Sequence, residues 1–450
     1  MYAHGIKITE TATALTPMTT VIQPVLAIGT AFKGAINFPT PIYNFEAFKE
    51  QFGFLDDFDS FTLEEVAHCF FNLFNTRPVL FVNVLDPSRH CKSTTKTLSG
   101  TSNPLTIQGA IFLSSIAITS GDKTLTLGED YSLSQDASTV TITVLKQTNI
   151  TGDSINVTYS TADPSKVTND DVISGINQIE RVYPRLGMIP SCVIAPKFST
   201  TPEIATVMAS KARLINGIFK TIALADLNAD SATNAPTVKN SNSLADEFLV
   251  VCWPRVAFGE HTYHLSTQAA ALMNLVDASR GQIPYESPSN KLIRCDRTPD
   301  TEPLSHAEAN TLNSQGIVTA LNFNAWRLWG NRTSCYPTND DPKDSFIACR
   351  RMMNWIGNTL AVNYFSRIDS PVNRVLVDSV LDEVNLFLSG LTNQGALLGG
   401  RVAFLEDDNP TTNLADGLIV FRVYLGLVTP ARQIEFNLEF DTNYFATLFA

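Results

Sequence analysis

Apolar and polar residues alternate without interruption near the end of the chain, over residues 434–441 (IEFNLEFD). This period of two predicts a β-strand with one buried face. The apolar face consists of Ile434, Phe436, Leu438 and Phe440. Near the other end, residues 5–11 (GIKITET) alternate in the same way, with Ile6 and Ile8 on one side. Strand-like segments at both ends predict assembly by strand exchange between subunits, the alternative being that the last strand completes its own subunit's sheet.

Between the two ends, short continuous apolar runs alternate with helical patterns. The runs predicted as buried strands are residues 25–30, 78–84, 191–196, 219–224 and 248–253. The segments predicted as helices are residues 45–52, 63–74, 169–182, 203–215 and 265–279, the third with Thr168 or Asn169 as its N-cap. Strands that are apolar on both sides are expected where helices cover both faces of a sheet. The order of these elements therefore predicts a layered α/β domain.

The composition changes abruptly at residue 93. Residues 93–162 are rich in Ser, Thr and Gly and contain no Cys, His or Trp. Alternating runs such as residues 139–144 (TVTITV) and 154–159 (SINVTY) are separated by Gly-Asp turns. This pattern predicts a small all-β sandwich that is inserted into a loop of the α/β domain, lies on the outer surface and is removable.

Two amphipathic helices are predicted after residue 345. The apolar face of the first consists of Phe346, Cys349, Met353, Ile356, Leu360 and Tyr364. The second is expected to begin with Ser370 as N-cap and Pro371 as first residue, and to end at Gly390. Its apolar stripe consists of Val372, Leu376, Val380, Val384 and Phe387. Residues 417–428 are predicted as a further strand, before the alternating terminal one.

The amino-acid composition favours some classes of function and argues against others. Of the 450 residues, 44% are hydrophobic and 17% charged, which fits a subunit that hides much of its surface in contacts. The formal net charge of −12 argues against nonspecific nucleic-acid binding, which needs a basic face. No apolar run approaches the ~20 residues of a membrane helix, and no secretory leader is visible, so we expect synthesis in a cytosol and no membrane insertion. The seven cysteines are scattered without CxxC spacing, which indicates small buried side chains rather than disulfides or a zinc site.

No motif for catalysis or for a cofactor stands out. The sequence has no phosphate-binding loop, no dinucleotide fingerprint and no nucleophile elbow. His261 and His264 lie beside Glu260, but their spacing on a loop favours a plain loop over a metal site. We expect no cofactor and no enzymatic activity. The alternative is an α/β-fold enzyme with its site where loops gather at strand ends, and a surface adhesin is a third reading that rests only on the Ser/Thr-rich segment.

Three stretches together resemble the contractile tail sheath proteins of myovirus-type phages and R-type bacteriocins. The first joins residues 2–11 (YAHGIKITET) to 25–31 (VLAIGTA). The second, and most specific, joins residues 310–320 (NTLNSQGIVTA) to 326–333 (WRLWGNRT). The third is the pair of C-terminal helices that ends in the alternating strand. The resemblance covers both ends and the α/β body, and leaves out the inserted segment.

The resemblance implies an α/β (α+β multidomain) fold whose C-terminal assembly domain, residues 306–450, lies nearest the tail tube and is completed by exchanged terminal strands. An N-terminal arm (1–24), an α/β body (25–92 and 163–305) and the inserted sandwich (93–162) make up the rest. The arm and the terminal strand are implied to pair with a neighbouring subunit's sheet.

The implied function is structural. The sheath would polymerise around a tail tube and shorten to drive the tube through a cell envelope, without nucleotide. The implied partners are further copies in hexameric rings stacked helically, a tail tube protein, and baseplate and tail terminator proteins. The particle would be a virion tail or a bacteriocin, assembled in the cytoplasm of a bacterial host.

A sheath must hold its tube through contacts that are weak per subunit, which suits screened charge pairs. In this acidic chain the basic residues of the C-terminal domain are therefore candidates for tube contact. They are Arg350 and Arg351 on the first C-terminal helix, and Arg327 and Arg332 around the Trp-rich stretch. The alternatives are intradomain hydrogen bonds for Arg327 and Arg332, and plain solvation for Arg350 or Arg351.

Overall fold

An eight-stranded sheet with the order β17-β16-β13-β12-β11-β1-β3-β2 forms the centre of the computed structural model. The structure describes residues 18, 23–99, 102–136, 138–151 and 154–449, so the predicted N-terminal strand with Ile6 and Ile8 lies outside the described residues. The strands are β1 (Val25–Gly29), β2 (Thr40–Ile42), β3 (Val79–Asn83), β11 (Cys192–Ile194), β12 (Ala223–Asp226), β13 (Leu249–Cys252), β16 (Ile317–Asn322) and β17 (Trp326–Trp329).

The six inner strands run parallel, and β2 and β17 close the two edges in the antiparallel sense. Successive side chains of a strand point to opposite faces, and both faces are apolar and covered. One face packs against α1 (Phe45–Phe52), α2 (Thr62–Ala67), the following π-helix (His68–Leu73) and α7 (Leu265–Ser279). The other packs against α3 (Asn169–Ile176), α4 (Ile179–Leu186), α5 (Pro202–Arg213), α6 (Ala235–Ser241) and α8 (His306–Ser314). This arrangement confirms the predicted layered α/β body.

The predicted helices 45–52 and 265–279 are confirmed, whereas two others differ in detail. The segment predicted as one helix over 63–74 changes at His68 from an α-helix to a π-helix. The segment predicted over 169–182 is two helices, because the turn at residues 177–178 ends α3. Thr168 is the N-cap of α3, and its side chain accepts a hydrogen bond from the Asp171 amide in a capping box.

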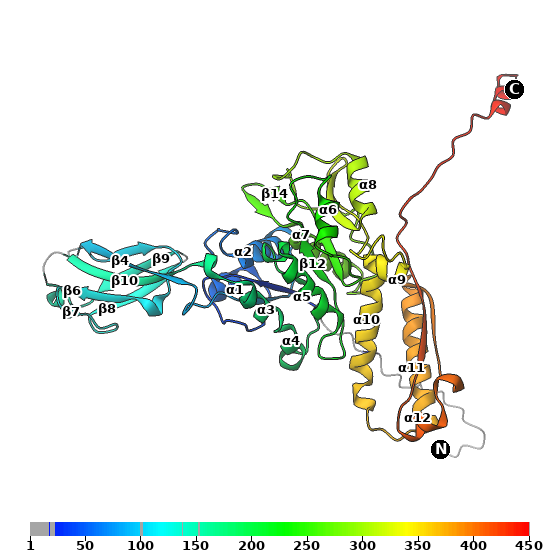
Figure 1. The fold of residues 1–450 in the computed structure, drawn as a ribbon, viewed down its shortest axis with the longest axis horizontal. Helices are drawn as coiled ribbons and strands as arrows, with labels where there is room; N and C mark the ends of the chain where they lie inside the picture. The colour runs from blue at the N-terminus through cyan, green and yellow to red at the C-terminus, as the bar shows by residue number, and fades with distance from the viewer. Residues whose placement is uncertain (1–17, 19–22, 100–101, 137, 152–153, 450) are drawn as a thin grey trace, which may run out of the picture.

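The inserted segment is a two-sheet β unit, as predicted. One sheet contains β4 (Cys91–Ser99), β10 (Ser154–Ala162), β6 (Ala117–Ser120) and β7 (Lys123–Thr124). The other contains β5 (Leu105–Gln108), β9 (Thr139–Val144) and β8 (Tyr131–Asp136). The sheets share a separate apolar core, and the unit projects from the body (Figure 1). It begins two residues earlier than predicted, because Cys91 is already paired with Ala162.

A second unit stands on the opposite side of the body from this insert (Figure 1). We call residues 347–427 the C-terminal unit. It contains α10 (Ile347–Tyr364), α11 (Arg374–Asn393), β18 (Leu397–Ala403), α12 (Thr411–Ala415) and β19 (Arg422–Leu427), and follows the short α9 (Pro342–Ser345). The N-cap of α11 is Asn373 rather than the predicted Ser370, because the Asn373 side chain accepts the Leu376 amide. Val372 is therefore exposed before the helix, while Val380 and Val384 are buried as predicted.

The predicted domain boundary at residue 306 is wrong. Strand β16 pairs in parallel with β13 of the body, with Ile317 opposite Val251, so the Trp-rich stretch belongs to the α/β body. The helix α8 ends before Gly316, which has φ of +67°. A Cβ atom at this position would lie 2.6 Å from the Tyr336 carbonyl oxygen, so the turn into β16 requires glycine.

Two smaller elements complete the description. β14 (Val256–Phe258) and β15 (His261–Tyr263) form a hairpin beside the main sheet. Across the described ranges, none of the helices is both long enough and apolar enough to cross a membrane.

Replacing residues 93–160 with a short Gly/Ser linker should leave the body folded, because the paired Cys91 and Ala162 bring the two cut ends together. The insert does cover part of the body, since Phe112 packs with the buried Phe32, Phe61 and Leu85. We therefore expect a loss of about 1–3 kcal/mol in the free energy of unfolding. Urea titration followed by Trp fluorescence measures this, since the insert contains no Trp. Phe112→Ala in the full chain should give a similar loss, and an insoluble deletion variant would contradict the expectation.

Candidate assembly site

The C-terminal unit is fixed to the α/β body by buried ion pairs on α10. Arg351 is only 5% exposed, and its guanidinium binds the carboxylate of Asp277 on α7 through two hydrogen bonds, one of them 3.1 Å long from Nη1 to Oδ1. Burial raises the pKa of Asp277, and the charge of Arg351 opposes this. A buried carboxylate and guanidinium in this bidentate geometry stabilise the fold only as a pair, because either one alone would be an uncompensated charge.

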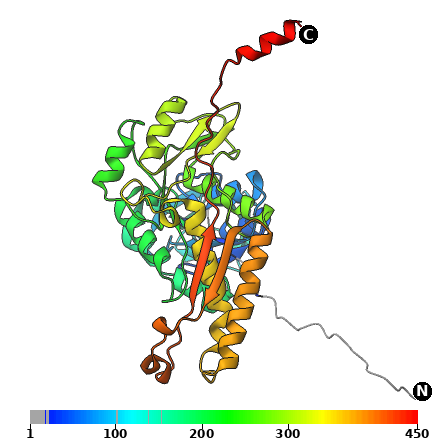
Figure 2. The same ribbon diagram turned by 90° about the vertical axis from the view of Figure 1, so that its right-hand side faces the viewer.

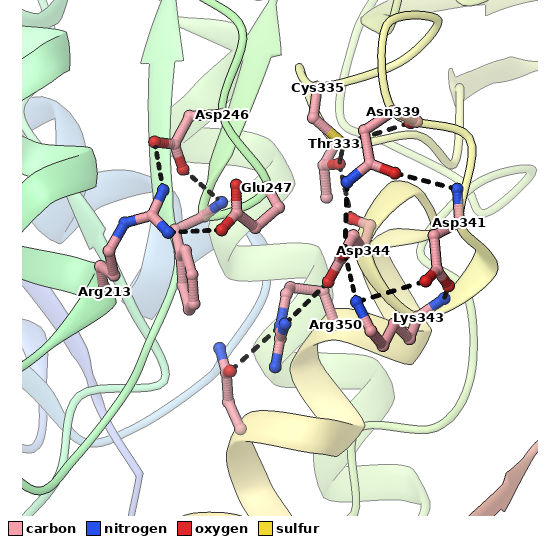
Figure 3. A network of polar contacts seen from close by, with 12 residues as sticks. Arg213, Asp246, Glu247, Thr333, Cys335, Asn339, Asp341, Lys343, Asp344 and Arg350 are labelled. Atoms are coloured by element: carbon pink, nitrogen blue, oxygen red, sulfur yellow. Dashed lines mark hydrogen bonds and ion pairs between the residues drawn. The ribbon is translucent and has the colours of Figure 1, made fainter.

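Arg350 of the same helix belongs to a second polar network (Figure 3). Its Nη1 lies 3.0 Å from Oδ1 of Asp344, its Nε lies 3.2 Å from Oδ1 of Asn354, and its guanidinium carbon lies 4.9 Å from the centre of the Phe248 ring. Arg213 of α5 lies 4.8 Å from the same ring and binds Asp246 and Glu247. Phe248 thus contacts one guanidinium from the body and one from α10, which adds a cation–π contribution to the junction.

Two asparagines extend this polar junction along α10. The Asn354 amide donates to the Thr221 carbonyl oxygen at 2.9 Å. Asn358 makes a reciprocal pair with Lys220, donating to its carbonyl oxygen at 2.7 Å and accepting from its amide at 2.9 Å. The sequence itself indicates a polar stripe on one face of this helix, because polar side chains recur every four residues at Arg350, Asn354 and Asn358.

The prediction that Arg350 and Arg351 are surface residues available to a tube is therefore wrong. Both side chains are buried and paired inside the subunit, because α10 turns its polar stripe toward the body instead of toward solvent. The alternative of plain solvation is wrong for the same reason.

Arg327 and Arg332 make the intradomain hydrogen bonds that were the alternative to tube contact. Nη1 of Arg327 donates to the Asn290 carbonyl oxygen at 3.0 Å. Nη1 of Arg332 donates to the Ser345 hydroxyl, and the guanidinium lies over the rings of Phe346 and Tyr336 at 3.6 and 4.4 Å from their centres. Both side chains remain half-buried.

The antiparallel pair β18–β19, here called the ribbon, lies over the helices α10 and α11 (Figure 2). Leu397 and Val402 of β18 are buried in the apolar core of the C-terminal unit. Val423, Leu425 and Leu427 of β19 belong to the same core but stay half-buried. Among the described residues neither strand has a second strand as neighbour, so both outer edges of the ribbon are open to a further strand, although the Val402 amide donates to Oδ1 of Asn385 at 3.0 Å.

The chain leaves β19 as a C-terminal arm, residues 428–449, which extends away from the body (Figures 1 and 2). Ile434, Phe436, Leu438 and Phe440 are 72–98% exposed. In the described part of the chain, the backbone of residues 434–440 makes no hydrogen bond to any other segment. A short 3₁₀-helix (Thr442–Phe449) follows, with Tyr444, Phe445 and Leu448 exposed.

The alternative in which the arm completes its own subunit's sheet is therefore wrong. The predicted strand residues Ile434, Phe436, Leu438 and Phe440 form no strand in the isolated subunit, although their alternation is that of one. A contiguous exposed run of large apolar side chains marks an interaction site.

The carboxyl edge of the parallel sheet, where an enzyme on this scaffold would carry its site, holds a hydrogen-bonded network. Asp226 at the end of β12 is buried and accepts hydrogen bonds from Ser199 and from Ser266, whose amide nitrogen lies at 3.0 Å. The Nδ1 atom of His264 lies 2.8 Å from the Glu65 carboxylate. Burial disfavours the imidazolium, but Glu65 outweighs it and raises the pKa of His264 to about 9.

The two histidines that could have formed a metal site are not brought together. His264 pairs with Glu65, whereas the ring of His261 stacks on Phe58 with 4.7 Å between ring centres. Over the described ranges, no group of three or more His, Cys, Asp or Glu side chains is placed to hold a metal ion.

Comparison with known proteins gives consistent relatives. No protein-family model matches the chain. The chain is 28% identical to the tail sheath protein of Burkholderia phage BcepMu, over 99% of this chain and 98% of that protein. It is 27% identical to a putative prophage major tail sheath protein of Pseudomonas aeruginosa, over 57% of this chain and 66% of that one. The chain is a homologue of phage tail sheath proteins.

The fold of this tail sheath homologue is shared with solved sheaths. The PVC sheath complex of an extracellular contractile injection system, in its contracted state, superposes with a TM-score of 0.63 at 14% identity over 99% of both chains. The contracted helical sheath of the anti-feeding prophage gives a TM-score of 0.61 at 14% identity over 98% of this chain. The predicted family resemblance and fold class are confirmed, and the relatives support a contractile sheath subunit.

The double substitution Arg350→Glu with Arg351→Glu should unfold or strongly destabilise the subunit, because it places like charges beside the buried Asp344 and Asp277. The loss should be at least roughly 3–5 kcal/mol in the free energy of unfolding, measured by urea titration. Arg374→Glu on α11 is the matched control, since the Arg374 side chain is 90% exposed and should change stability by less than about 1 kcal/mol. A double variant with a wild-type unfolding midpoint would contradict the buried-pair assignment.

The Glu65–His264 pair should make stability depend on pH in one direction. Because the folded-state pKa of His264 is raised to about 9, the pair contributes fully below the unfolded pKa of about 6.5 and loses its contribution as pH rises through about 9. The difference in the free energy of unfolding between wild type and Glu65→Gln should therefore be largest near about pH 6 and shrink above about pH 9. A difference that does not change over this range would show that His264 is not charged by Glu65.

Proposed function

We propose that the protein is the structural subunit of a contractile sheath, which polymerises around a tail tube and shortens to drive the tube through a cell envelope. The observation that carries the proposal is the C-terminal arm, whose apolar face is exposed and whose backbone has no hydrogen-bond partner among the described residues. The same subunit carries the ribbon, neither strand of which pairs with a further strand in the described part of the chain. A donor strand and an acceptor edge on one chain are the parts that strand exchange between copies requires.

The dimensions of the two parts match. The alternating segment 434–440 has the same length as β18, which spans seven residues. Each added strand would pair its backbone with a free edge of the ribbon and extend the sheet over the two helices. It would also cover apolar side chains that β19 leaves half-buried, such as Val423 and Leu425. The N-terminal segment with Ile6 and Ile8 is proposed to add to the same sheet from another neighbour.

Contraction then needs no nucleotide. Subunits linked through exchanged strands can rotate as rigid bodies and gain new contacts, so that the assembly itself stores the free energy that is released. The buried pairs on α10 support such rigid-body motion, because they join the C-terminal unit to the α/β body at several points.

The proposed partners follow from this role and from the relatives. They are further copies of this chain in stacked hexameric rings, a tail tube protein, a baseplate and a tail terminator. One similar solved structure is the baseplate of the anti-feeding prophage, with a TM-score of 0.62 at 15% identity. The proposed location is a virion tail or a bacteriocin-like particle assembled in the cytoplasm of the bacterial host. Arg327 stays a proposed tube contact.

Removing residues 434–450 should leave a folded subunit that does not polymerise, and removing residues 1–13 should act in the same way. Phe436→Asp should act like the C-terminal deletion, because it buries a charge in the exchanged strand and should raise the critical concentration for polymerisation by at least roughly a hundredfold. Sedimentation and negative-stain microscopy measure polymer formation.

Asn437→Asp is the matched control, since it adds the same charge on the opposite face of the predicted strand. It should polymerise close to wild type. Normal-length sheaths from either truncation would refute strand exchange, and monodisperse small particles from the wild type would favour the alternative of an α/β-fold enzyme.

A further inference from the structure

A cleft of about 1060 Å³ lies where the C-terminal arm leaves the body. It is bounded on one side by residues 428–434 of the arm and on the other by the Trp-rich stretch and α8. Its charged side chains are Lys291, Arg332, Arg432 and Glu286, with His306 beside them. Three of these side chains are cationic and one is anionic, so the cleft is positive within a chain whose formal net charge is −12.

The positive charge comes from the two arginines. Glu286 forms an ion pair with Lys291 in the cleft and a second one with Arg280, so it is not available to either arginine of the cleft. Arg332 stacks on aromatic rings and has no carboxylate within ion-pair distance among the described residues. Burial lowers its pKa, and the charge of nearby Arg432 acts in the same direction. Arg432 is exposed and likewise forms no ion pair with any described residue. Two neighbouring guanidinium groups that share one cleft without a counter-charge favour an acidic occupant.

The most acidic surface of the C-terminal unit is the connection between β18 and β19. We call residues 405–418 the acidic tip. It carries Glu406, Asp407, Asp408 and Asp416, and residues 402–421 contain no Lys or Arg. Asp408 is paired with Arg422, whereas Glu406, Asp407 and Asp416 are exposed.

The conformation of the acidic tip is fixed by a buried side chain. The Asn409 amide donates to the carbonyl oxygens of Leu405 and Val420, at 2.8 and 2.9 Å, and its Oδ1 accepts from the Val420 amide at 2.8 Å. This clamp holds the two ends of the tip together, so the exposed carboxylates are presented by an ordered loop rather than a loose one.

The acidic tip and the arginine cleft lie at opposite ends of the C-terminal unit. In Figures 1 and 2, α12 of the tip is at the lower end of the long helices, and the arm leaves at the upper end. Surfaces of opposite charge at opposite ends of one body can meet only between copies. Such a head-to-tail contact repeats from copy to copy, and it builds a ring if the rotation closes or an open helical polymer if it does not.

We infer that the acidic tip of one copy docks into the arginine cleft of the next, as a second contact along the direction in which the arm extends. The inference rests on the proposed function and names the two surfaces that meet between successive copies. The contact would guide the arm, because the arm begins at the cleft and would then run along the copy whose tip occupies it. As an exposed ionic contact it would weaken as salt concentration rises.

A charge-swap experiment on the full chain tests this inference. Arg432→Glu alone, and Glu406→Arg with Asp407→Arg, should each raise the critical concentration for polymerisation at low salt by about fivefold or more. The triple variant that combines both changes should return to within about twofold of wild type, because the charges are exchanged rather than lost. Asp382→Arg is the matched control, since Asp382 is exposed on α11 of the same unit but outside the tip. It should polymerise as wild type does.

The inference is overturned if Arg432→Glu, or Glu406→Arg with Asp407→Arg, polymerises as wild type does. It is also overturned if the critical concentration of the triple variant is as high as that of the variants changed on one surface only. Neither result contradicts the proposed sheath function, provided that Phe436→Asp still blocks polymerisation. A wild-type chain that stays monomeric at every concentration and salt would contradict the proposed function itself, and this contact with it.

Discussion

The backbone of one seven-residue segment determines how this molecule can function. Residues 434–440 have a regular apolar face and a full set of backbone donors and acceptors, and no backbone hydrogen bond joins them to another described segment. Buried backbone groups are almost always paired, so burying this segment requires a partner strand, and we propose that another chain supplies it. The ribbon offers what this segment lacks, because among the described residues neither of its strands has a second strand as neighbour and its apolar face is half-covered. In the proposed assembly, other copies of the same chain supply a partner for this segment and a further strand for the ribbon.

In the proposed assembly, an exchanged strand can transmit motion between subunits only if the C-terminal unit is rigidly joined to the α/β body of the same subunit. The junction at α10 meets this requirement by adding polar contacts to its apolar packing, in which Ile347 joins the core of the body. The bidentate pair between Arg351 and Asp277 and the reciprocal amide pair between Asn358 and Lys220 have demanding geometry. Apolar packing would tolerate small rotations of the helix, whereas these contacts are satisfied in one orientation. We regard this as the reason for charged side chains at a buried junction, a role that ionic groups have in some other proteins.

Much of the fold could be predicted because its signals are local. The composition of the insert and the period of two in its strands identified a separate β unit to within two residues. Continuous apolar runs identified the covered parallel strands. The cap of α11 was predicted at the wrong residue, because Ser370 and Asn373 are both suited to capping and only the structure shows which side chain accepts the first free amide.

The errors at the candidate site concern contacts between distant parts of the chain. Asp277 lies 74 residues from Arg351 in sequence, so no local pattern shows that this arginine on a polar helix face has a buried partner. The domain boundary failed for the same reason, since the pairing of β16 with β13 spans residues 249–322. The alternation of the C-terminal arm, in contrast, is visible in the sequence, because a period of two is a local pattern that does not depend on which chain supplies the partner strand.

Amide hydrogen exchange, measured on the same protein as monomer and as polymer, tests the central claim most directly. If strand exchange completes the subunit, amides of residues 434–440 should exchange freely in the monomer and become strongly protected in the polymer. Protection should rise at the same time along β18 and β19, while α10, already anchored to the body, should change little. A polymer in which residues 434–440 exchange as fast as in the monomer would contradict the account.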